Sequence, residues 1–490
     1  MSNTKEFDLL VKNVRVARAT GNGLEDADIG IKDGKFAKIA PNLAADSAAD
    51  VYDAQNRIAF PGCVDPHMHT GIYSPYEQDA VTESRAAAMG GVTSSLNYTR
   101  TGGYYLNKGG PYADFLPEVL DISDGRFHVD YLYHIAPMDR NHIAEIPALI
   151  RDFGQLSYKI YMFYGGHGLH GSAGDQHKFL MIDKDEKYDI AHFEFVMRGI
   201  QSATEQYPDL AGDISLSMHC ETAEIMAAYT KIVEGEGKLS GLAAYSASRP
   251  PHSEGLAIFI ASYLANETNL PNLNLLHLTS AKAVTAAMQM QAVFPHINFR
   301  REVTIGHLML DIDAPTGNLA KVNPPIRPRE DVENLWDNVL EGNIDWVCSD
   351  HACCKYEMKV DQEEPGNVWL AKSGFGGTEY MLSAFVGEGH KRGMSYNDIA
   401  RMSSLAAAQR FGLHNKGDIQ EGLDADIAIV DPDETWTVRA EDSESQQGHT
   451  PFEGQELSAR TKTTFLRGNL IYDNNEVIGE PTGQYLRRLN

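Results

Sequence analysis

The stretch VDPHMHTG, residues 64–71, completes a short apolar run and contains two histidines one residue apart. If this run is a strand, the i, i+2 spacing turns His67 and His69 to the same face, where they could bind one metal ion together. Chance alone gives roughly 0.7 H-x-H motifs in a chain of this length and histidine content. The pair therefore indicates a metal site only if residues further along the chain provide the other ligands.

The run that ends at His67 is the first of eight short apolar runs that alternate with longer helical patterns. They are GCVDPH (62–67), GVTSSLNY (91–98), HVDYLYHIA (128–136), LSYKIYMFY (156–164), ISLSMHC (214–220), LNLLHLT (273–279), INFRREVT (297–304) and IDWVCSD (344–350). Helical patterns stand between them, for example in residues 190–207, 253–266 and 281–294. Eight strand–helix units over about 350 residues predict an α/β fold, a (β/α)8 barrel built on a parallel sheet.

The two ends of the chain show a different pattern of short strands and turns. FDLLVKNVRVA and ADIGIKDGKFAKIA lie near the start, and strand patterns return after Gly412 in ADIAIVDP, TKTTFLRG and NLIYDNN. We predict that residues 1–60 and 413–479 form one small β-sandwich domain beside a barrel of residues 61–412. The tail, residues 480–490, has no evident place in that domain, and we expect it to lie on a neighbouring chain.

The composition excludes several classes of protein. Lys and Arg total 42 against 68 Asp and Glu, a formal net charge of −26, which disfavours binding to nucleic acid or to an anionic membrane. No run approaches about 18 apolar residues, and the start lacks a secretory pattern, so we expect neither a membrane span nor export. Five scattered cysteines, an odd number, favour the cytoplasm over a disulfide framework.

Residues that could bind metal stand at or near the ends of five of the eight runs. They are His67 and His69 in the first, Lys159 in the fourth, His219 in the fifth, His277 in the sixth and Asp350 in the eighth. In a barrel of this kind the carboxyl ends of the strands carry the active site, so the six side chains should converge. A lone strand histidine is more often a hydrogen-bonded core residue, but that interpretation does not explain the whole set.

Lys159 is the unexpected member of this set. A lysine ammonium, with an ordinary pKa near about 10.4, does not bind a cation. Between Tyr158 and Ile160 the side chain should be partly buried, which lowers its pKa and frees the amine. Reaction with CO2 would then give a carbamate able to bridge two metal ions, whereas a salt-bridged or snorkelling lysine is the alternative that spacing alone favours.

In chain order, VDPHMHTG, KIYMFY, SMHCE, LLHLTSAKA and CSDHA resemble the metal-site motifs of the amidohydrolase superfamily. The cyclic-amide hydrolases, namely hydantoinase/dihydropyrimidinase, allantoinase and dihydroorotase, are the most similar branch. Further similar segments, among them TESRAAAMGGVT, SRPPHSEGLAI, KVNPPIR and HTPFEG, extend the resemblance from about Asp8 to Asn474. The motifs are specific for the branch as a set and much less so for one substrate.

The resemblance implies two divalent ions, zinc in most members, with manganese or cobalt as alternatives. His67, His69 and Asp350 would hold one ion, and His219 with His277 would hold the other. Lys159, carbamylated by CO2 to N6-carboxylysine, and a hydroxide would bridge the pair. Asp350 would also carry the proton from the attacking hydroxide to the leaving nitrogen.

Tyr164 stands five residues after Lys159, where hydantoinases have a tyrosine that stabilises the oxyanion. The loops that contact substrate in the family differ here. Asn323 replaces the serine before the two prolines, and Ser373, followed by Gly374, replaces an asparagine. We expect these residues to bind the ring amide and to influence which ring is accepted. Dihydroorotases place an arginine just after H-x-H, but Thr70 follows here, which disfavours that activity.

We therefore predict a metal-dependent homotetrameric hydrolase that opens a neutral cyclic amide or imide, such as a 5-substituted hydantoin or a dihydropyrimidine. Aromatic residues expected at the mouth should accept an apolar substituent; they are Tyr73, Tyr76, Tyr104, Tyr105 and Phe163. An allantoin-like ring, a lactam or a linear amide is the alternative substrate. A catalytically silent protein such as the collapsin response mediator proteins, which share this fold, is disfavoured because all six ligands are present.

Three further histidines stand in the glycine-rich segment GGHGLHGSAGDQH, residues 165–177. His167, His170 and His177 could form a third metal site. Histidines in a loop at the mouth are more often solvated, and we expect that here.

Overall fold

The computed structural model describes residues 5–166, 168, 169 and 176–489. Eight parallel strands form the inner sheet, each paired with the next along the chain. These strands are β6 (Cys63–Met68), β7 (Val92–Thr99), β8 (Asp130–Ile135), β9 (Ser157–Tyr161), β10 (Ser215–His219), β11 (Asn272–Leu275), β12 (Asn298–Thr304) and β13 (Trp346–Cys348). Each of the eight predicted runs overlaps one of them. The amide of His69 donates to the carbonyl of His351 at 2.8 Å, which joins the first strand to the chain just after the last.

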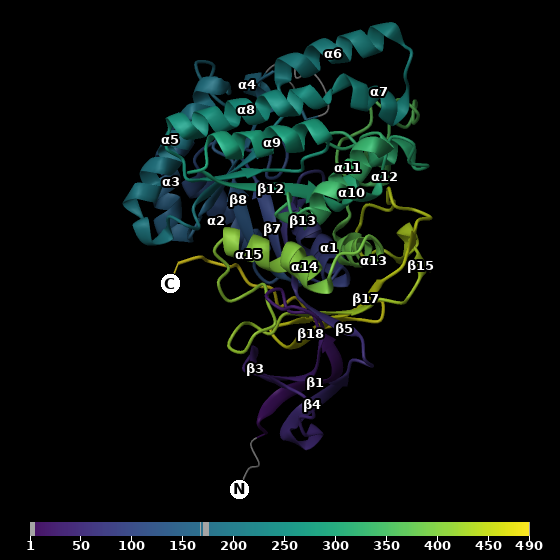
Figure 1. Ribbon diagram of the computed structural model, residues 1–490. Helices are drawn as coiled ribbons and strands as arrows, with labels where there is room; N and C mark the ends of the chain where they lie inside the picture. The colour runs from purple at the N-terminus through teal and green to yellow at the C-terminus, as the bar shows by residue number, and fades with distance from the viewer. Residues whose placement is uncertain (1–4, 167, 170–175, 490) are drawn as a thin grey trace.

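Helices surround this barrel and fill the upper part of the molecule in Figure 1. The longer ones are α1 (Tyr76–Met89), α2 (Tyr112–Ser123), α3 (Arg140–Phe153), α5 (Ile190–Gln206), α6 (Ala223–Glu236), α7 (Gly241–Ser248), α8 (Pro251–Glu267), α9 (Ala281–Val293), α11 (Arg329–Leu340) and α13 (Met381–Lys391). The short ones are α4 (Gln176–Leu180), α10 (Ile305–Met309), α12 (Tyr356–Lys359), α14 (Tyr396–Ala400) and α15 (Ala406–Arg410). Asp139 and Asp189 cap α3 and α5 by accepting hydrogen bonds from their first amides. None of the helices that the described residues form is long and apolar enough to span a membrane.

A second sheet of nine strands combines strands from the N-terminal and C-terminal parts of the chain and lies below the barrel in Figure 1. Its strands are β1 (Phe7–Val16), β2 (Glu25–Lys32), β3 (Lys35–Ala40), β4 (Ala48–Asp53), β5 (Ile58–Pro61), β14 (Ile427–Asp431), β17 (Arg460–Leu466), β18 (Asn469–Asp473) and β19 (Glu476–Val477). The late strand β14 pairs antiparallel with the early strand β5. Val11, Ile29 and Ile427 share one core on this sheet. The predicted pairing of the chain ends is therefore confirmed. A two-stranded sheet of β15 (Trp436–Thr437) and β16 (Glu456–Leu457) lies apart.

The C-terminal tail packs on the barrel of its own chain, so the expectation that it lies on a neighbour is wrong. The amide of Tyr131, in β8, donates to the carbonyl of Gln484 at 3.0 Å, and the Arg488 guanidinium, which is buried, donates to Ser157 Oγ at 3.0 Å. Gly483 passes so close to β8 that a Cβ there would lie 1.9 Å from the carbonyl oxygen of Val129. The tail therefore provides hydrogen-bond partners for backbone groups at the start of β8, which would otherwise be buried without them.

Candidate metal centre and active site

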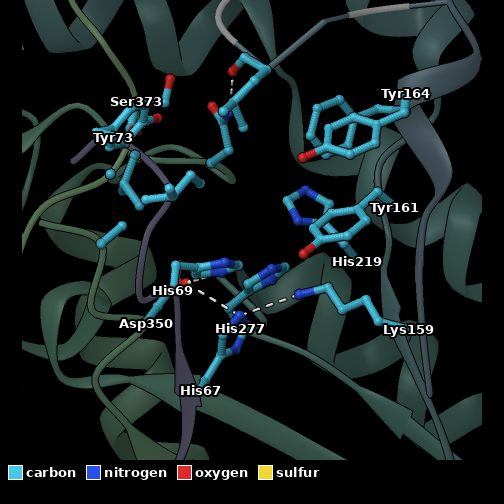
Figure 2. A pocket seen from close by; sticks show the side chains of 17 residues that line it. His67, His69, Tyr73, Lys159, Tyr161, Tyr164, His219, His277, Asp350 and Ser373 are labelled. Carbon is cyan, nitrogen blue, oxygen red and sulfur yellow. Dashed lines mark hydrogen bonds and ion pairs between the residues drawn. The ribbon is translucent and has the colours of Figure 1, made fainter. Parts of the chain in front are cut away.

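One cavity at the carboxyl ends of the barrel strands brings together all the predicted site residues (Figure 2). Its lining includes His67, His69, Lys159, Tyr164, His219, His277, Asn323, Asp350, Ser373 and Gly374. Each metal-ligand candidate stands in or within two residues of a strand. His277 and Asp350 adopt positive φ angles of 34° and 53°. Such angles are uncommon outside glycine and tend to occur at functional sites, where the rest of the structure enforces them.

His67, His69 and Asp350 form one compact group of donors. Oδ1 of Asp350 lies 3.1 Å from Nε2 of His67 and 3.3 Å from Nε2 of His69. The Lys159 amine lies 3.2 Å from the same His67 nitrogen (Figure 2). All four side chains are buried. Two imidazoles and a carboxylate at this spacing suit a divalent transition metal such as zinc.

His219 and His277 form the second group of donors. Their ring centroids are 4.3 Å apart. Nε2 of His219 lies 2.7 Å from Oε2 of Glu221, so the ring can offer its other nitrogen. Nδ1 of His277 is buried and has no hydrogen-bond partner among the described residues. Leaving a buried nitrogen unsatisfied costs free energy, which a bound metal ion would recover. The residues present therefore fit a divalent metal pair.

Glu302, which no sequence motif singled out, connects the two groups from β12. Its Oε1 lies 2.8 Å from Nδ1 of His67 and accepts a hydrogen bond from the amide of His277 at 3.1 Å. Oε2 accepts from the Trp346 indole at 2.9 Å. Carboxylates that hold the far nitrogen of a ligating histidine fix its tautomer and orientation. The partners of Glu302 come from three other parts of the barrel, so no local pattern marks it.

Burial sets the charge of the donors. It lowers the pKa of Lys159 to about 8, although Asp350 and Glu302 oppose the shift. Burial raises the pKa of Asp350 to about 7, with Lys159 opposing. Burial and the Lys159 charge hold the pKa values of His67 and His69 well below the ordinary range. Both imidazoles are therefore neutral, which is the form that binds metal.

The Tyr164 hydroxyl points into the cavity above His219 (Figure 2). The Tyr164 ring stacks on Tyr161, with centroids 4.5 Å apart and planes 13° apart, so two tyrosines form one wall. This arrangement places a phenolic donor opposite the metal-ligand candidates. A hydroxyl in that position can donate to an oxygen that gains negative charge during the reaction.

The expected aromatic mouth is smaller than predicted. Tyr73 and Phe163 belong to the cavity lining, whereas Tyr76, Tyr104 and Tyr105 do not. The Tyr76 ring packs against Gly71, and the Tyr105 hydroxyl lies 2.8 Å from Nδ1 of His69. Tyr105 therefore orients a ligand candidate instead of forming the wall.

Asn323 and Ser373 line the cavity, but hydrogen bonds within the protein already use the Asn323 side chain. Its Oδ1 accepts from the Tyr245 hydroxyl at 2.5 Å and from the Arg249 guanidinium. Its Nδ2 donates to the carbonyl of Leu169 at 2.8 Å. This side chain joins the loop after β9 to the barrel, so it is not free to bind a substrate ring without breaking those bonds.

Of the three histidines considered for a third metal site, His177 does not belong to the lining of this cavity. His177 lies in α4 and lines a separate hollow beside the loop. His167 and His170 lie outside the described residues.

This chain is similar in sequence and in fold to known proteins. The amidohydrolase family model matches residues 214–471. An allantoinase of Rubrobacter xylanophilus is 29% identical over 490 residues, 98% of each chain, and one of Salmonella choleraesuis is 30% identical over 477 residues, 95% of each chain. Among solved structures, L-hydantoinase (dihydropyrimidinase) from Arthrobacter aurescens is 26% identical with a TM-score of 0.83, covering 98% of this chain and 99% of that one.

A dihydropyrimidinase from Brevibacillus agri matches similarly, with 25% identity, a TM-score of 0.82 and 98% coverage of both chains. The relatives share one family and one fold. Their names imply the same reaction, hydrolysis of a C–N bond in a cyclic amide. The predicted class, a (β/α)8 barrel with a small β domain, is confirmed with them. This chain belongs to the amidohydrolase family, in the branch of enzymes that hydrolyse the C–N bonds of cyclic amides at a pair of divalent metal ions.

Proposed function

We propose that this enzyme opens the ring of a 5-substituted hydantoin. The observation that carries the proposal is the convergence of six metal-ligand candidates and the Tyr164 hydroxyl on one cavity. Apolar side chains, among them Ile72, Phe163 and Val322, form much of the remaining lining and suit a small ring with a substituent. Hydantoinases and dihydropyrimidinases among the structural relatives support the same ring class.

Allantoin is the second candidate, because the two curated relatives at 29% and 30% identity are allantoinases. Allantoin is itself a hydantoin that carries a polar ureido group. The same ring therefore meets the same donors, and only the substituent differs. A polar substituent would lie toward Asn323 and Ser373, which contribute polar atoms to the cavity lining.

In this proposal His67, His69 and Asp350 hold one ion, and His219 and His277 hold the other. When bound, the ions polarise the ring carbonyl and acidify the attacking water. Asp350 takes the proton of that water and gives it to the ring nitrogen as the C–N bond breaks. Tyr164 donates its hydroxyl proton in a hydrogen bond to the carbonyl oxygen as that oxygen becomes negative.

Lys159 completes this centre as N6-carboxylysine. An ammonium that faces His67 at 3.2 Å would repel a cation, whereas a carbamate formed with CO2 offers two oxygens that share one negative charge at the same place. Burial in an aromatic and histidine-lined environment keeps a fraction of the amine neutral and able to react. We propose zinc as the metal, on the imidazole and carboxylate donor set.

A substrate panel tests the proposal. It contains 5-substituted hydantoins, dihydrouracil, allantoin, dihydroorotate, glutarimide and linear N-acyl amino acids, each assayed for ring opening or amide hydrolysis with metal-loaded enzyme. We expect turnover of the hydantoins, with allantoin among them. Turnover of the linear amides alone would contradict the assignment of a cyclic substrate. It would not contradict the proposed role of the metal ions.

We further propose a homotetramer located in the cytoplasm. Leu256, Phe259 and Tyr263 of α8 are exposed large apolar residues, and Tyr229 and Ile232 of α6 are exposed as well. An apolar face of this kind is typical of an interface between subunits. All five cysteines are buried thiols, which suits a reducing compartment. Light scattering at micromolar concentration tests the assembly, and a monomer would contradict it.

The division into domains is likewise a proposal. Residues 1–60 and 413–479 would form the β-sandwich domain and residues 61–412 the barrel. The tail from residue 480 would belong with the barrel, since Gln484 and Arg488 bind to it.

A further inference from the structure

Arg100 is a fully buried cation beside Tyr164. It directly follows β7, and its guanidinium carbon lies 5.0 Å from the ring centroids of both Tyr164 and Phe179. One of its terminal nitrogens donates to the carbonyl of Thr101 at 3.0 Å. The backbone makes room for it, because a Cβ at Gly102 would lie 2.9 Å from that nitrogen.

Arg100 differs from comparably buried arginines in what balances its charge. Arg249 lies 3.2 Å from the Glu221 carboxylate and Arg327 lies 2.7 Å from that of Glu254. Among the described residues no carboxylate pairs with Arg100, and its Nε has no hydrogen-bond partner. A buried charge without a counterion lowers stability, so packing alone does not explain an arginine here.

The neighbours of Arg100 are aromatic rings, and one of them carries the hydroxyl that faces the cavity. Burial raises the pKa of Tyr164, and the Arg100 charge opposes that shift. The cation also attracts the face of the Tyr164 ring. A nearby positive charge makes a phenol a stronger hydrogen-bond donor, and it does so most when the acceptor becomes negative.

We propose that Arg100 is a positioning residue for catalysis: it holds the Tyr164 ring and strengthens its hydroxyl as a donor to the oxyanion. The inference rests on the proposed function, in which Tyr164 makes that hydrogen bond. The guanidinium itself lies outside the cavity lining. It therefore acts through Tyr164 and does not bind the ring of the substrate.

The first test compares Arg100→Met, which replaces the guanidinium with an unbranched apolar side chain, with Arg100→Lys, which keeps the positive charge. Both are assayed on whichever cyclic substrate the unmodified enzyme opens. We expect Arg100→Met to lower kcat by about 10-fold or more, with KM changed less than about threefold, because the lost interaction forms only in the transition state. Arg100→Lys should recover much of that loss. Metal content should match the unmodified enzyme in both.

A double-mutant cycle with Tyr164→Phe decides whether the effect passes through the phenol. In the Tyr164→Phe background, Arg100→Met should lower kcat no further. If the losses in kcat from Arg100→Met and Tyr164→Phe multiply in the double mutant, the assignment is overturned. An unchanged kcat in Arg100→Met alone would overturn it as well. Full activity of Tyr164→Phe would instead contradict the oxyanion role of Tyr164 in the proposed function. If Arg100→Met fails to fold, Arg100→Gln, which removes the charge but keeps a polar side chain, distinguishes the same two outcomes when it is measured in both backgrounds.

Discussion

Among the single residues, Lys159 is the one whose chemistry changes in the proposed centre. Its amine lies 3.8 Å from the centroid of the Tyr98 ring and 3.2 Å from His67 Nε2, in a space without solvent contact. An unmodified ammonium there would repel two cations. Both its position and its lowered pKa suit reaction with CO2.

Lys159→Ala should lose the second ion and nearly all turnover, because the bridging ligand is gone. A short carboxylic acid such as acetate or propionate should enter the vacated space and restore part of both. Metal content and kcat, measured with and without the acid, check this. An active Lys159→Ala enzyme without any additive would show that the lysine is only structural.

Asp350 has two proposed roles, metal binding and proton transfer, that substitution can separate. Asp350→Asn keeps an oxygen that can bind a metal but cannot carry a proton. We expect most of the metal to be retained and kcat to fall by about 100-fold or more. Elemental analysis together with steady-state kinetics tests this, and unchanged turnover would remove Asp350 from proton transfer.

Among the helices and strands, α1 holds the first and last metal-binding loops together. Asp79 accepts a hydrogen bond from the amide of Gly71 at 2.8 Å, just after H-x-H. One turn later, Glu83 contacts Nε2 of His351 at 2.7 Å, next to Asp350. A helix that holds both loops in this way preorganises the ligands before an ion arrives.

The loop that contains Ser373 depends on a buried lysine. The Lys359 ammonium donates to the carbonyls of Lys321, Lys372 and Gly374 at 2.8, 2.9 and 2.6 Å. These three bonds fix the loop at the edge of the cavity, where the ring amide is expected to bind.

Lys359→Met should leave the carbonyls of Lys372 and Gly374 without a donor, whereas the carbonyl of Lys321 keeps its hydrogen bond from the Gly374 amide. We expect the free energy of unfolding to fall by about 2 kcal/mol or more and KM to rise severalfold, because the loop loosens. Lys355→Met, four residues earlier on the same segment, is the matched control and should change neither. Denaturant unfolding and kinetics measure both variants, and an unchanged KM in Lys359→Met would separate this loop from substrate binding.

In the molecule as a whole, the closed barrel explains why the sequence predicted so much of the site. Each metal-ligand candidate stands at or near the end of an apolar run, as His219 ends β10, and closure of the barrel brings those ends to one place. Glu302 and Arg100 also stand on or beside barrel strands, but their roles depend on partners far away in the chain. Sequence periodicity does not encode such contacts, so neither residue stood out.

The tail was mispredicted for the same reason. Residues 480–489 have no apolar periodicity that predicts a strand, and their partners, Tyr131 and Ser157, belong to strands far away in sequence. Likewise, the sequence placed Asn323 at the cavity but did not show that Tyr245, Arg249 and the loop after β9 use its side chain.

Gly483→Ala tests the packing of the tail against the barrel. The added Cβ would collide with the carbonyl of Val129, so the tail must shift, and we expect a loss of about 1–3 kcal/mol in the free energy of unfolding. Gly212→Ala is the control, since open space surrounds the position of its Cβ. Equal stability of the two variants would show that the tail contributes nothing to the barrel.

Two divalent ions, held by six residues at or near the strand ends, are proposed to perform the hydrolysis. A titration of metal-depleted enzyme with zinc tests this proposal, with bound metal followed by elemental analysis and ring opening of a 5-substituted hydantoin followed in the same samples. We expect activity, absent in depleted enzyme, to rise to its maximum at two ions per chain. Full activity at well under one ion per chain would contradict the two-metal centre.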